Sequence, residues 1–250
     1  MTIPPLREKI TVGKIDFDLR MLISLIMVAL ACIMARSPLG TPWLAPLFRP
    51  FSRYMPNLMG MVHDQCFFFL ILPLLVILLV FRENPLKYGL GIGKWRESLV
   101  WTVVICAALA VILWFTVGNS LQLKSYYQMY YSAPASKSAP FSPGLGNQEI
   151  TFFSHVRMFY ICVVQLIGWE FILRGFLLFA LARSIGPGPA ICVQMVPFAL
   201  MHIGKPGLEL YTTPFSGIGF GFIAWRCQSF WPVFLIHLFM LVFVILIAMM

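Results

Sequence analysis

Eight apolar runs occupy most of this chain, and several of them are as long as a membrane-spanning helix. They lie at roughly 20–35, 65–81, 98–117, 152–168, 171–183, 188–202, 214–228 and 230–250. A helix needs about 20 apolar residues to cross the hydrocarbon core of a bilayer. Only 11% of the residues are charged, whereas a soluble domain carries about 25%. We therefore expect an all-α polytopic membrane protein, with about eight transmembrane helices in a single bundle and no sheet.

The polar N-terminal segment 1–19 differs in character from the rest of the chain. It lacks the apolar core and small-residue cleavage site of a signal peptide, so we expect the first apolar run to be retained as a span. The membrane domain is then 20–250. Its fourth to seventh runs are shorter and richer in glycine, which predicts helices buried among other helices. Gly217 and Gly221, four residues apart, have the small-residue spacing that allows close helix packing.

Two polar connections stand out between the apolar runs. Segment 36–64 contains five prolines, and segment 118–150 contains four of the eight tyrosines. The tyrosines are Tyr126, Tyr127, Tyr130 and Tyr131. Tyrosines beside a membrane favour an interfacial belt, and a lid that gates a substrate site is the alternative.

The net charge of +9 indicates contact with anionic lipid headgroups, because the Lys and Arg residues lie mostly between apolar runs. We expect no nucleic-acid partner. With eight spans and a cytoplasmic N-terminus, nine Lys and Arg residues fall on the cytoplasmic side and seven on the other. This count favours a cytoplasmic N-terminus. It places Lys205 on the cytoplasmic side and both Arg183 and Arg226 on the opposite side.

Four ionisable residues lie in or at the edge of the late apolar runs: Glu170, Arg174, His202 and His237. Ionisable groups inside a bilayer are costly and persist when they are paired or functional. Glu170 and Arg174 share a helix face at i and i+4, so an ion pair that fastens helices is one interpretation. A carboxylate and two imidazoles that converge can also activate a water. We expect His63 and His155, near the predicted interfaces, to be structural, and the six cysteines to be small buried hydrophobes.

The order of these residues resembles a known family. The pattern E-x-x-x-R-G begins at Glu170, F-x-x-x-H ends at His202, and a glycine-rich helix precedes His237. Over about 168–241 this is similar to the CPBP family, the CAAX-protease and bacteriocin-processing (Abi) intramembrane proteases. The resemblance implies an eight-helix fold and a peptidase that acts on prenylated CAAX tails or membrane-associated peptides. A W-E-x-x-x-R-G motif with G-K-P-x-x-E downstream looks like some bacterial relatives, which implies a bacterial cell membrane.

Two positions depart from the family pattern. Trp169 stands where the family usually has the first of two glutamates, and Leu241 stands where it usually has asparagine. Both usual groups are polar and catalytic, so their loss bears on activity. Glu209, seven positions after His202, is a candidate replacement for the first glutamate. The alternative is a solvated loop residue paired with Lys205.

The leading interpretation is an intramembrane endopeptidase of CPBP type. Glu170 would act as the base or position the water, Arg174 would hold it, and His202 and His237 would bind the water, the oxyanion or a metal. Two histidines and a carboxylate suit an open zinc site, so His202 and His237 are candidate zinc ligands, with a metal-free mechanism equally compatible.

The main alternative is a catalytically silent CPBP relative that serves as a membrane subunit or scaffold in a protein complex. In one version of this alternative, the intramembrane histidines bind a pigment or haem. A transporter is a third, weaker interpretation, because the sequence has no repeat symmetry.

Overall fold

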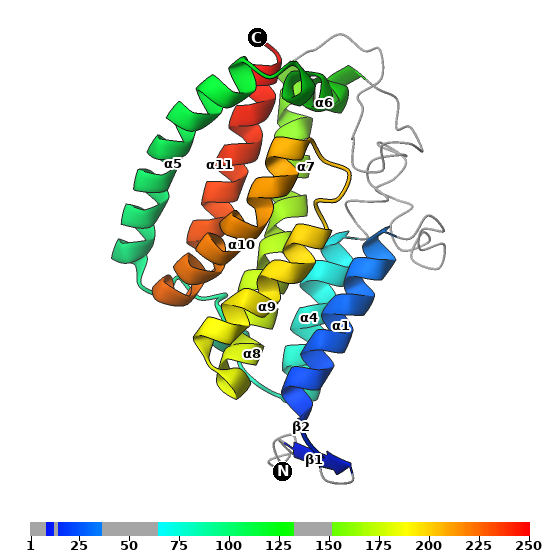
Figure 1. Ribbon diagram of the computed structural model, residues 1–250. Coiled ribbons are helices and arrows are strands. Elements are labelled where there is room, and N and C mark those ends of the chain that lie inside the picture. The colour runs from blue at the N-terminus through cyan, green and yellow to red at the C-terminus, as the bar shows by residue number, and fades with distance from the viewer. Residues whose placement is uncertain (1–8, 13–14, 37–64, 133–151) are drawn as a thin grey trace.

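The computed structural model describes residues 9–12, 15–36, 65–132 and 152–250, and these residues form a helical bundle (Figure 1). The N-terminal half contains β1 (Lys9–Val12), β2 (Ile15–Asp18), α1 (Leu19–Arg36), η1 (Phe67–Ile71), α4 (Leu72–Leu75), η2 (Val76–Phe81), η3 (Pro85–Tyr88), α5 (Trp95–Gly118) and α6 (Leu121–Ser132). The C-terminal half contains α7 (Phe152–Glu170), η4 (Phe171–Leu177), α8 (Leu178–Ile185), α9 (Pro187–Leu200), α10 (Gly207–Cys227) and α11 (Trp231–Ala248). Segment 36–64 beyond Arg36, including His63, and segment 133–151 lie outside the described residues.

The expected class of all-helical polytopic membrane protein is confirmed. Within the described residues, three helical stretches are long and apolar enough to cross a membrane: Trp95–Gly118, Met158–Ile185 and Trp231–Ala248. The helices Leu19–Met34, Phe67–Phe81 and Pro187–Leu200 are apolar but shorter. The remaining long helix, α10, carries more polar residues along its length.

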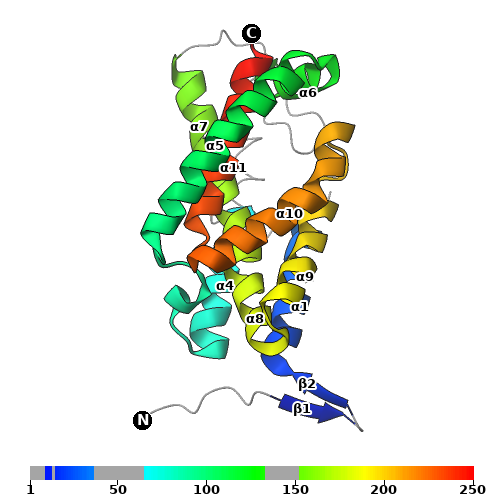
Figure 2. The same ribbon diagram turned by 60° about the vertical axis from the view of Figure 1, so that its left-hand side comes forward.

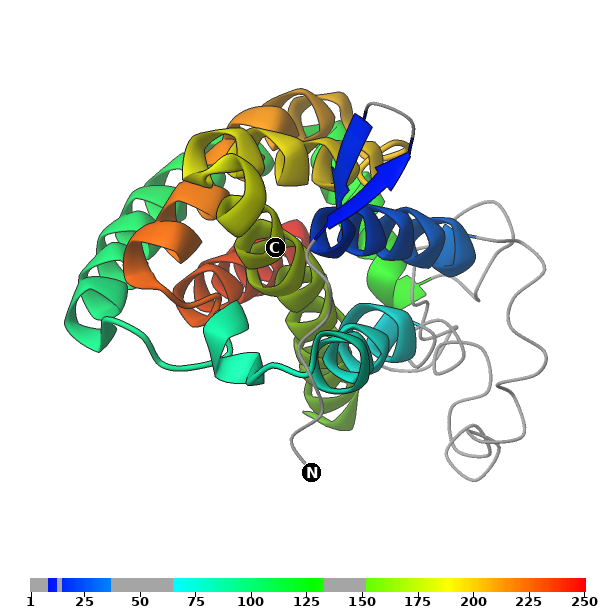
Figure 3. The ribbon, with the colours of Figure 1, turned by 90° about the horizontal axis from the view of Figure 1, so that it is seen from below.

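The runs 152–168 and 171–183 were expected to be separate spans, and this expectation is wrong. Segments α7, η4 and α8 follow one another without a break from Phe152 to Ile185. Trp169 and Glu170 alone separate the two runs in the sequence, and no proline lies there, so the helix continues past Gly168. Gly186, with φ of 80°, and Pro187 provide the break instead. Seen from below, this helix lies at the centre of the bundle (Figure 3). In its most apolar 18-residue stretch, 83% of the residues are buried inside the protein.

Because these two runs form one span, three charged residues lie at the opposite end of the bundle from the one expected. Arg183 forms an ion pair with Glu83, and Arg226 pairs with Glu97 at 3.0 Å, which places both arginines at the end where α1 begins. Lys205 lies at the other end, beyond α9. When Arg183 and Arg226 move to the end where α1 begins and Lys205 moves to the other end, the first of these ends has ten Lys and Arg residues instead of nine, and the other has six instead of seven.

A two-stranded hairpin precedes α1, so the expectation of no sheet is wrong for the N-terminal tail. Strands β1 and β2 pair antiparallel, with Lys9 opposite Asp18. Asp18 then accepts a hydrogen bond from the Met21 backbone N–H at 2.9 Å, as a helix N-cap does. Its other carboxylate oxygen accepts a bond from Ser184 Oγ at 2.5 Å, which ties the start of α1 to the end of α8.

An ionic cluster at this end of the bundle centres on Glu83. Its carboxylate contacts Arg20 at 2.5 Å, Arg183, and the Tyr88 hydroxyl, which donates at 3.1 Å. Burial of the carboxylate opposes its ionisation, but Arg183, Arg20 and Tyr88 outweigh that effect and hold the pKa of Glu83 below its usual range. The cluster therefore connects α1 and α8 to the loop after η2.

Close backbone approaches join the late helices. The small-residue pair Gly217 and Gly221 faces α9, where an added Cβ would lie 2.9 Å from Met195 Cγ and 2.5 Å from Gln194 Nε2, respectively. At the hairpin end, Gly93 has φ of 59°, and a Cβ there would lie 2.2 Å from the Cys227 carbonyl oxygen. The predicted tight packing of the glycine-rich helix is thus confirmed.

Candidate functional site

Glu170 and Arg174 form a fully buried ion pair on the central helix. Glu170 is the last residue of α7, and Arg174 follows in η4. The Arg174 Nη1 atom lies 3.3 Å from each carboxylate oxygen of Glu170, and both side chains are 0% exposed. The guanidinium also stacks over the Phe198 ring at 3.8 Å. An aromatic face stabilises a desolvated cation, so both the Glu170 carboxylate and the Phe198 ring stabilise the buried Arg174 guanidinium.

His237 brings α11 into contact with this pair. Its Nδ1 lies 2.6 Å from Glu170 Oε1. The two nitrogens of an imidazole face different directions, so the contact with Glu170 leaves Nε2 pointing elsewhere. His237 lines a cavity of the described structure, whereas Glu170 does not. Glu170 therefore reaches that cavity through the imidazole.

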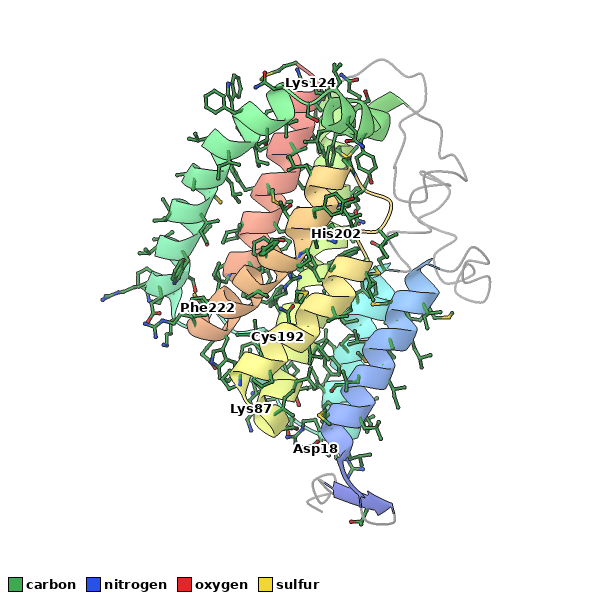
Figure 4. All side chains as sticks on the ribbon, in the orientation of Figure 1. Asp18, Lys87, Lys124, Cys192, His202 and Phe222 are labelled. Carbon is green, nitrogen blue, oxygen red and sulfur yellow. The ribbon has the colours of Figure 1, made fainter. Side chains whose placement is uncertain are left out.

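His202 lies just beyond the end of α9, between the labelled Lys124 and Lys87 in the view of Figure 4. Its Nδ1 lies 2.8 Å from the Phe198 carbonyl oxygen. A carbonyl only accepts, so Nδ1 carries the proton, and Nε2 of the neutral ring is an acceptor. The ring is packed edge-on against Trp169, with centroids 5.7 Å apart.

Glu209 lies in the first turn of α10, whereas the alternative interpretation of the sequence had it in a solvated loop. Pro206 precedes the helix and Gly207 begins it. Glu209 Oε1 lies 2.6 Å from Lys205 Nζ and 4.0 Å from His202 Nε2, and Oε2 accepts a 2.6 Å hydrogen bond from the Tyr127 hydroxyl. Glu209 therefore forms the expected pair with Lys205, and it also faces His202, as a carboxylate of the site would.

A cavity of about 580 Å³ connects these groups. Its polar lining includes His202, His237, Glu209 and Lys205. Its apolar walls come from α5, α6, α10 and α11, and include Leu109, Ile112, Leu113, Leu123 and Leu241. A mostly apolar cavity with a few convergent polar groups is typical of a ligand or substrate site.

The two positions that depart from the family pattern, Trp169 and Leu241, are both buried. Trp169 Nε1 donates to Gln65 Oε1 at 3.1 Å, and its ring packs edge-on against Phe69. Leu241 lines the cavity one helical turn after His237. Among the residues that the structure describes, no second carboxylate contacts Glu170, and Glu209 approaches the cavity from the His202 side instead.

The described residues contain no group of three or more His, Cys, Asp and Glu side chains spaced to hold a metal ion. His237 Nδ1 is used by Glu170, and His202 Nδ1 by Phe198. Metal-bound histidines commonly donate their other ring N–H to a carboxylate or a backbone carbonyl, so His202 and His237 stay candidate zinc ligands through Nε2, and the reaction proposed below uses no metal.

The sequence analysis did not predict the roles of Tyr127 and Gln65 at the site. Tyr127 was assigned with its neighbours to an interfacial belt or a lid, and its bond to Glu209 was not expected. Gln65, at the start of an apolar run, was not singled out at all. The cluster of tyrosines around Tyr127 was a signal that could have pointed to the site. Gln65, a single glutamine at the start of an apolar run, was a weaker signal. His155 lies exposed in the first turn of α7, away from the cavity lining.

The fold and the site together define an integral membrane protein with a buried Glu–Arg–His cluster beside an apolar cavity. Residues 151–243, which span α7 to α10 and most of α11, match the family model of type II CAAX prenyl endopeptidase Rce1-like proteins. The resemblance to the CPBP intramembrane proteases is thereby confirmed. Searches of characterised proteins and of solved structures find no match to the chain.

Proposed function

We propose that this protein is an intramembrane endopeptidase that hydrolyses membrane-associated or lipidated peptides. One observation carries the proposal: His237 lines the cavity while its Nδ1 contacts the buried carboxylate of Glu170 at 2.6 Å. A carboxylate that holds an imidazole in one tautomer and stabilises its protonated form is a recurrent device of hydrolases. The CAAX endopeptidase family match supports a peptide as the substrate.

In the proposed reaction, a water in the cavity attacks the carbonyl carbon of the scissile peptide bond. The water gives its proton to His237 Nε2, and Glu170 stabilises the resulting imidazolium across the 2.6 Å contact. The proton then passes to the leaving amine as the C–N bond breaks. Arg174 holds the Glu170 carboxylate in place, because its guanidinium lies 3.3 Å from both carboxylate oxygens.

His202 and Glu209 bind the water in this proposal. Neutral His202 Nε2 and Glu209 Oε1 are both acceptors, 4.0 Å apart. A water bound there donates one hydrogen bond to this pair of acceptors and keeps its other O–H for His237 Nε2. Glu209 thus takes the place of the carboxylate that the family usually has at Trp169, and Lys205 and Tyr127 orient it.

The protein's orientation is part of the proposal. We propose a bacterial cell membrane, with segment 1–19 in the cytoplasm and the membrane domain at 20–250. The ten-to-six distribution of basic residues supports this orientation, since cytoplasmic ends carry an excess of Lys and Arg.

A silent membrane subunit is the second candidate function. It is favoured by Trp169, whose indole is fully paired with Gln65 where the family has a carboxylate, and by Leu241. In that case the protein would copurify with a stoichiometric membrane partner. The histidines would then serve packing or hold a planar apolar ligand such as a haem.

The test is peptide cleavage by purified protein, with a library of lipidated and membrane peptides. We expect Glu170→Gln to keep the fold and lower turnover by roughly 10²–10⁴-fold, the usual contribution of acid–base catalysis. His237→Ala should lose a similar factor, and Glu209→Gln should also lower the rate.

Glu97→Gln is the matched control, because Glu97 pairs with Lys94 and Arg226 at the far end from the cavity. It should retain full activity. If the wild type cleaves no peptide and is recovered with a tight partner, the silent subunit replaces the enzyme.

A further inference from the structure

The proposed reaction needs a hydrogen-bond donor that none of the residues assigned so far supplies. When the water adds to the scissile carbonyl, a C–O bond forms and the carbonyl π electrons move to the oxygen, which becomes an oxyanion. Enzymes stabilise this charge with fixed donors, which include Asn and Gln side chains. His202 Nε2 and Glu209 Oε1 are acceptors, and His237 Nε2 accepts the proton of the water. The donor therefore has to come from elsewhere in the cavity lining.

Several other donors of the cavity lining are already used. Lys205 Nζ and the Tyr127 hydroxyl each donate to the Glu209 carboxylate at 2.6 Å. Four more hydroxyl side chains of the lining donate to backbone carbonyls of their own helices: Thr116, Thr212, Thr213 and Ser216. A hydroxyl carries one O–H, so these hydroxyls are occupied, and the Lys205 ammonium is held against Glu209.

Gln165 is a buried glutamine of α7 that lines the same cavity. Its carboxamide carries two N–H donors, and only 9% of the residue is exposed. Within the part of the chain that the structure describes, this carboxamide forms no hydrogen bond. Burial of an amide without a partner is costly. A glutamine in a cavity wall is therefore suited to donate to a ligand in the cavity.

The register of two helices places Gln165 close to the reacting groups. Helices α7 and α11 pack together and run in opposite directions, so that α11 ends at the end of the bundle where α7 begins (Figure 2). The contact between Glu170 and His237 fixes their register. With a rise of 1.5 Å per residue, Gln165 lies about 7.5 Å from the level of this contact along α7, and Leu241 about 6 Å along α11 in the same direction. Gln165 and Leu241 therefore lie at nearly the same level.

The face of α7 that carries Gln165 also leads to His202. Gln165 and Trp169 are four residues apart, so they share a helix face, and the Trp169 ring packs edge-on against His202. Leu241, which lines the cavity, stands where the family usually has asparagine. The carboxamide that is missing from α11 thus has a counterpart at the same level on the neighbouring helix.

We propose that Gln165 is a catalytic residue whose carboxamide N–H donates to the carbonyl oxygen of the scissile peptide bond. This proposal rests on the proposed peptidase function and completes its reaction. The hydrogen bond strengthens as negative charge develops on that oxygen. When the intermediate collapses, the C=O bond forms again, the C–N bond breaks, and the proton on His237 Nε2 passes to the leaving amine. Gln165 itself gains and loses no proton.

The test compares wild type with Gln165→Met, which keeps most of the side-chain volume and removes both donors. The substrate is the peptide that the wild type cleaves fastest in the library. Removal of one oxyanion donor lowers kcat by about 10²–10³-fold, so we expect a loss of that size with KM nearly unchanged, because the bond is made mainly in the transition state. A phosphonate analogue of this peptide, whose tetrahedral anionic group resembles the intermediate, should bind less tightly by a similar factor.

A second substitution supplies the amide from the other helix. In the double variant Gln165→Met with Leu241→Asn, turnover should recover at least tenfold, because the two positions lie at the same level of the cavity. Gln122→Leu is the matched control, since Gln122 is an exposed glutamine of α6 outside the cavity lining, and it should keep full turnover. Thermal unfolding shows that each variant is folded, and Gln165→Leu replaces Gln165→Met if that variant is not.

The outcomes separate this proposal from the peptidase function. If the wild type cleaves its peptide and the folded Gln165 variant cleaves it at the same rate, Gln165 is not the donor and the peptidase function stands. If Gln165→Met binds the substrate and the phosphonate with equal losses of affinity, the residue acts in ground-state binding and the proposal is wrong. If the wild type cleaves no peptide of the library, the peptidase function and this proposal fail together.

Discussion

Replacing Arg174 tests whether the buried ion pair organises the site. Arg174→Met keeps much of the side-chain volume and its contact with Phe198, but it removes the charge that lies 3.3 Å from both oxygens of Glu170. The carboxylate is 0% exposed and would remain ionised without its partner or take up a proton. Breaking one side of a buried pair costs about 3–5 kcal/mol, which corresponds to a fall of roughly 6–20 °C in Tm for a chain of this size.

The assay is thermal unfolding of detergent-purified protein, followed by tryptophan fluorescence. Arg226→Met is the matched control, because the Arg226 side chain is 56% exposed and pairs with Glu97 at the surface, where an ion pair contributes about 0–1 kcal/mol. The double variant Arg174→Met with Glu170→Gln should recover more than half of the loss, since no unpaired charge is left. Equal Tm values for Arg174→Met and Arg226→Met would refute the argument.

Three further predictions concern other parts of the fold. Stability should fall as the pH drops from about 5 to about 3. The folded protein lowers the pKa of Glu83 below the value of about 4.3 in the unfolded chain, so the ionised carboxylate stabilises the fold and protonation removes that contribution. When Tm is measured against pH, Glu83→Gln should show a flatter curve. Gly93→Ala should lower Tm far more than Gly91→Ala, since φ at Gly93 is 59° and its Cβ would meet a carbonyl oxygen at 2.2 Å, whereas the nearest atom at Gly91 is 3.9 Å away; equal effects would contradict this. Tyr127→Phe removes a hydrogen bond to a carboxylate, worth about 1.5–3 kcal/mol, so hydrogen exchange in α6 should accelerate. Tyr211→Phe, at an exposed position on α10, should leave it unchanged.

The parts of the site that are local in sequence were predictable. Glu170 and Arg174 are four residues apart on one helix, so their pairing follows from helix geometry. The histidines were recognisable because an imidazole in an apolar run is unusual. The helical class followed from the length and composition of the apolar runs.

The parts that depend on distant segments were not predictable. Tyr127 and Glu209 are 82 residues apart, and Gln65 and Trp169 are 104 residues apart, so no spacing rule relates them. The single helix through Glu170 was missed for a related reason. Polar residues suggest a loop when their partners are unknown, and the partner of Glu170 on α11 is supplied only by the folded bundle.

Helix α5 gives the cavity an unusual boundary. It contributes Leu109, Ile112 and Leu113 to the lining, yet only 6% of the residues in its most apolar 18-residue stretch are buried within the protein. In a membrane, acyl chains surround the rest of this helix and reach the margin of the cavity. Lipid tails then compete with the substrate for the same apolar space, so chain length and headgroup become variables of the reaction. Rates measured in short-chain detergent and in long-chain vesicles should differ even when the protein itself is unchanged.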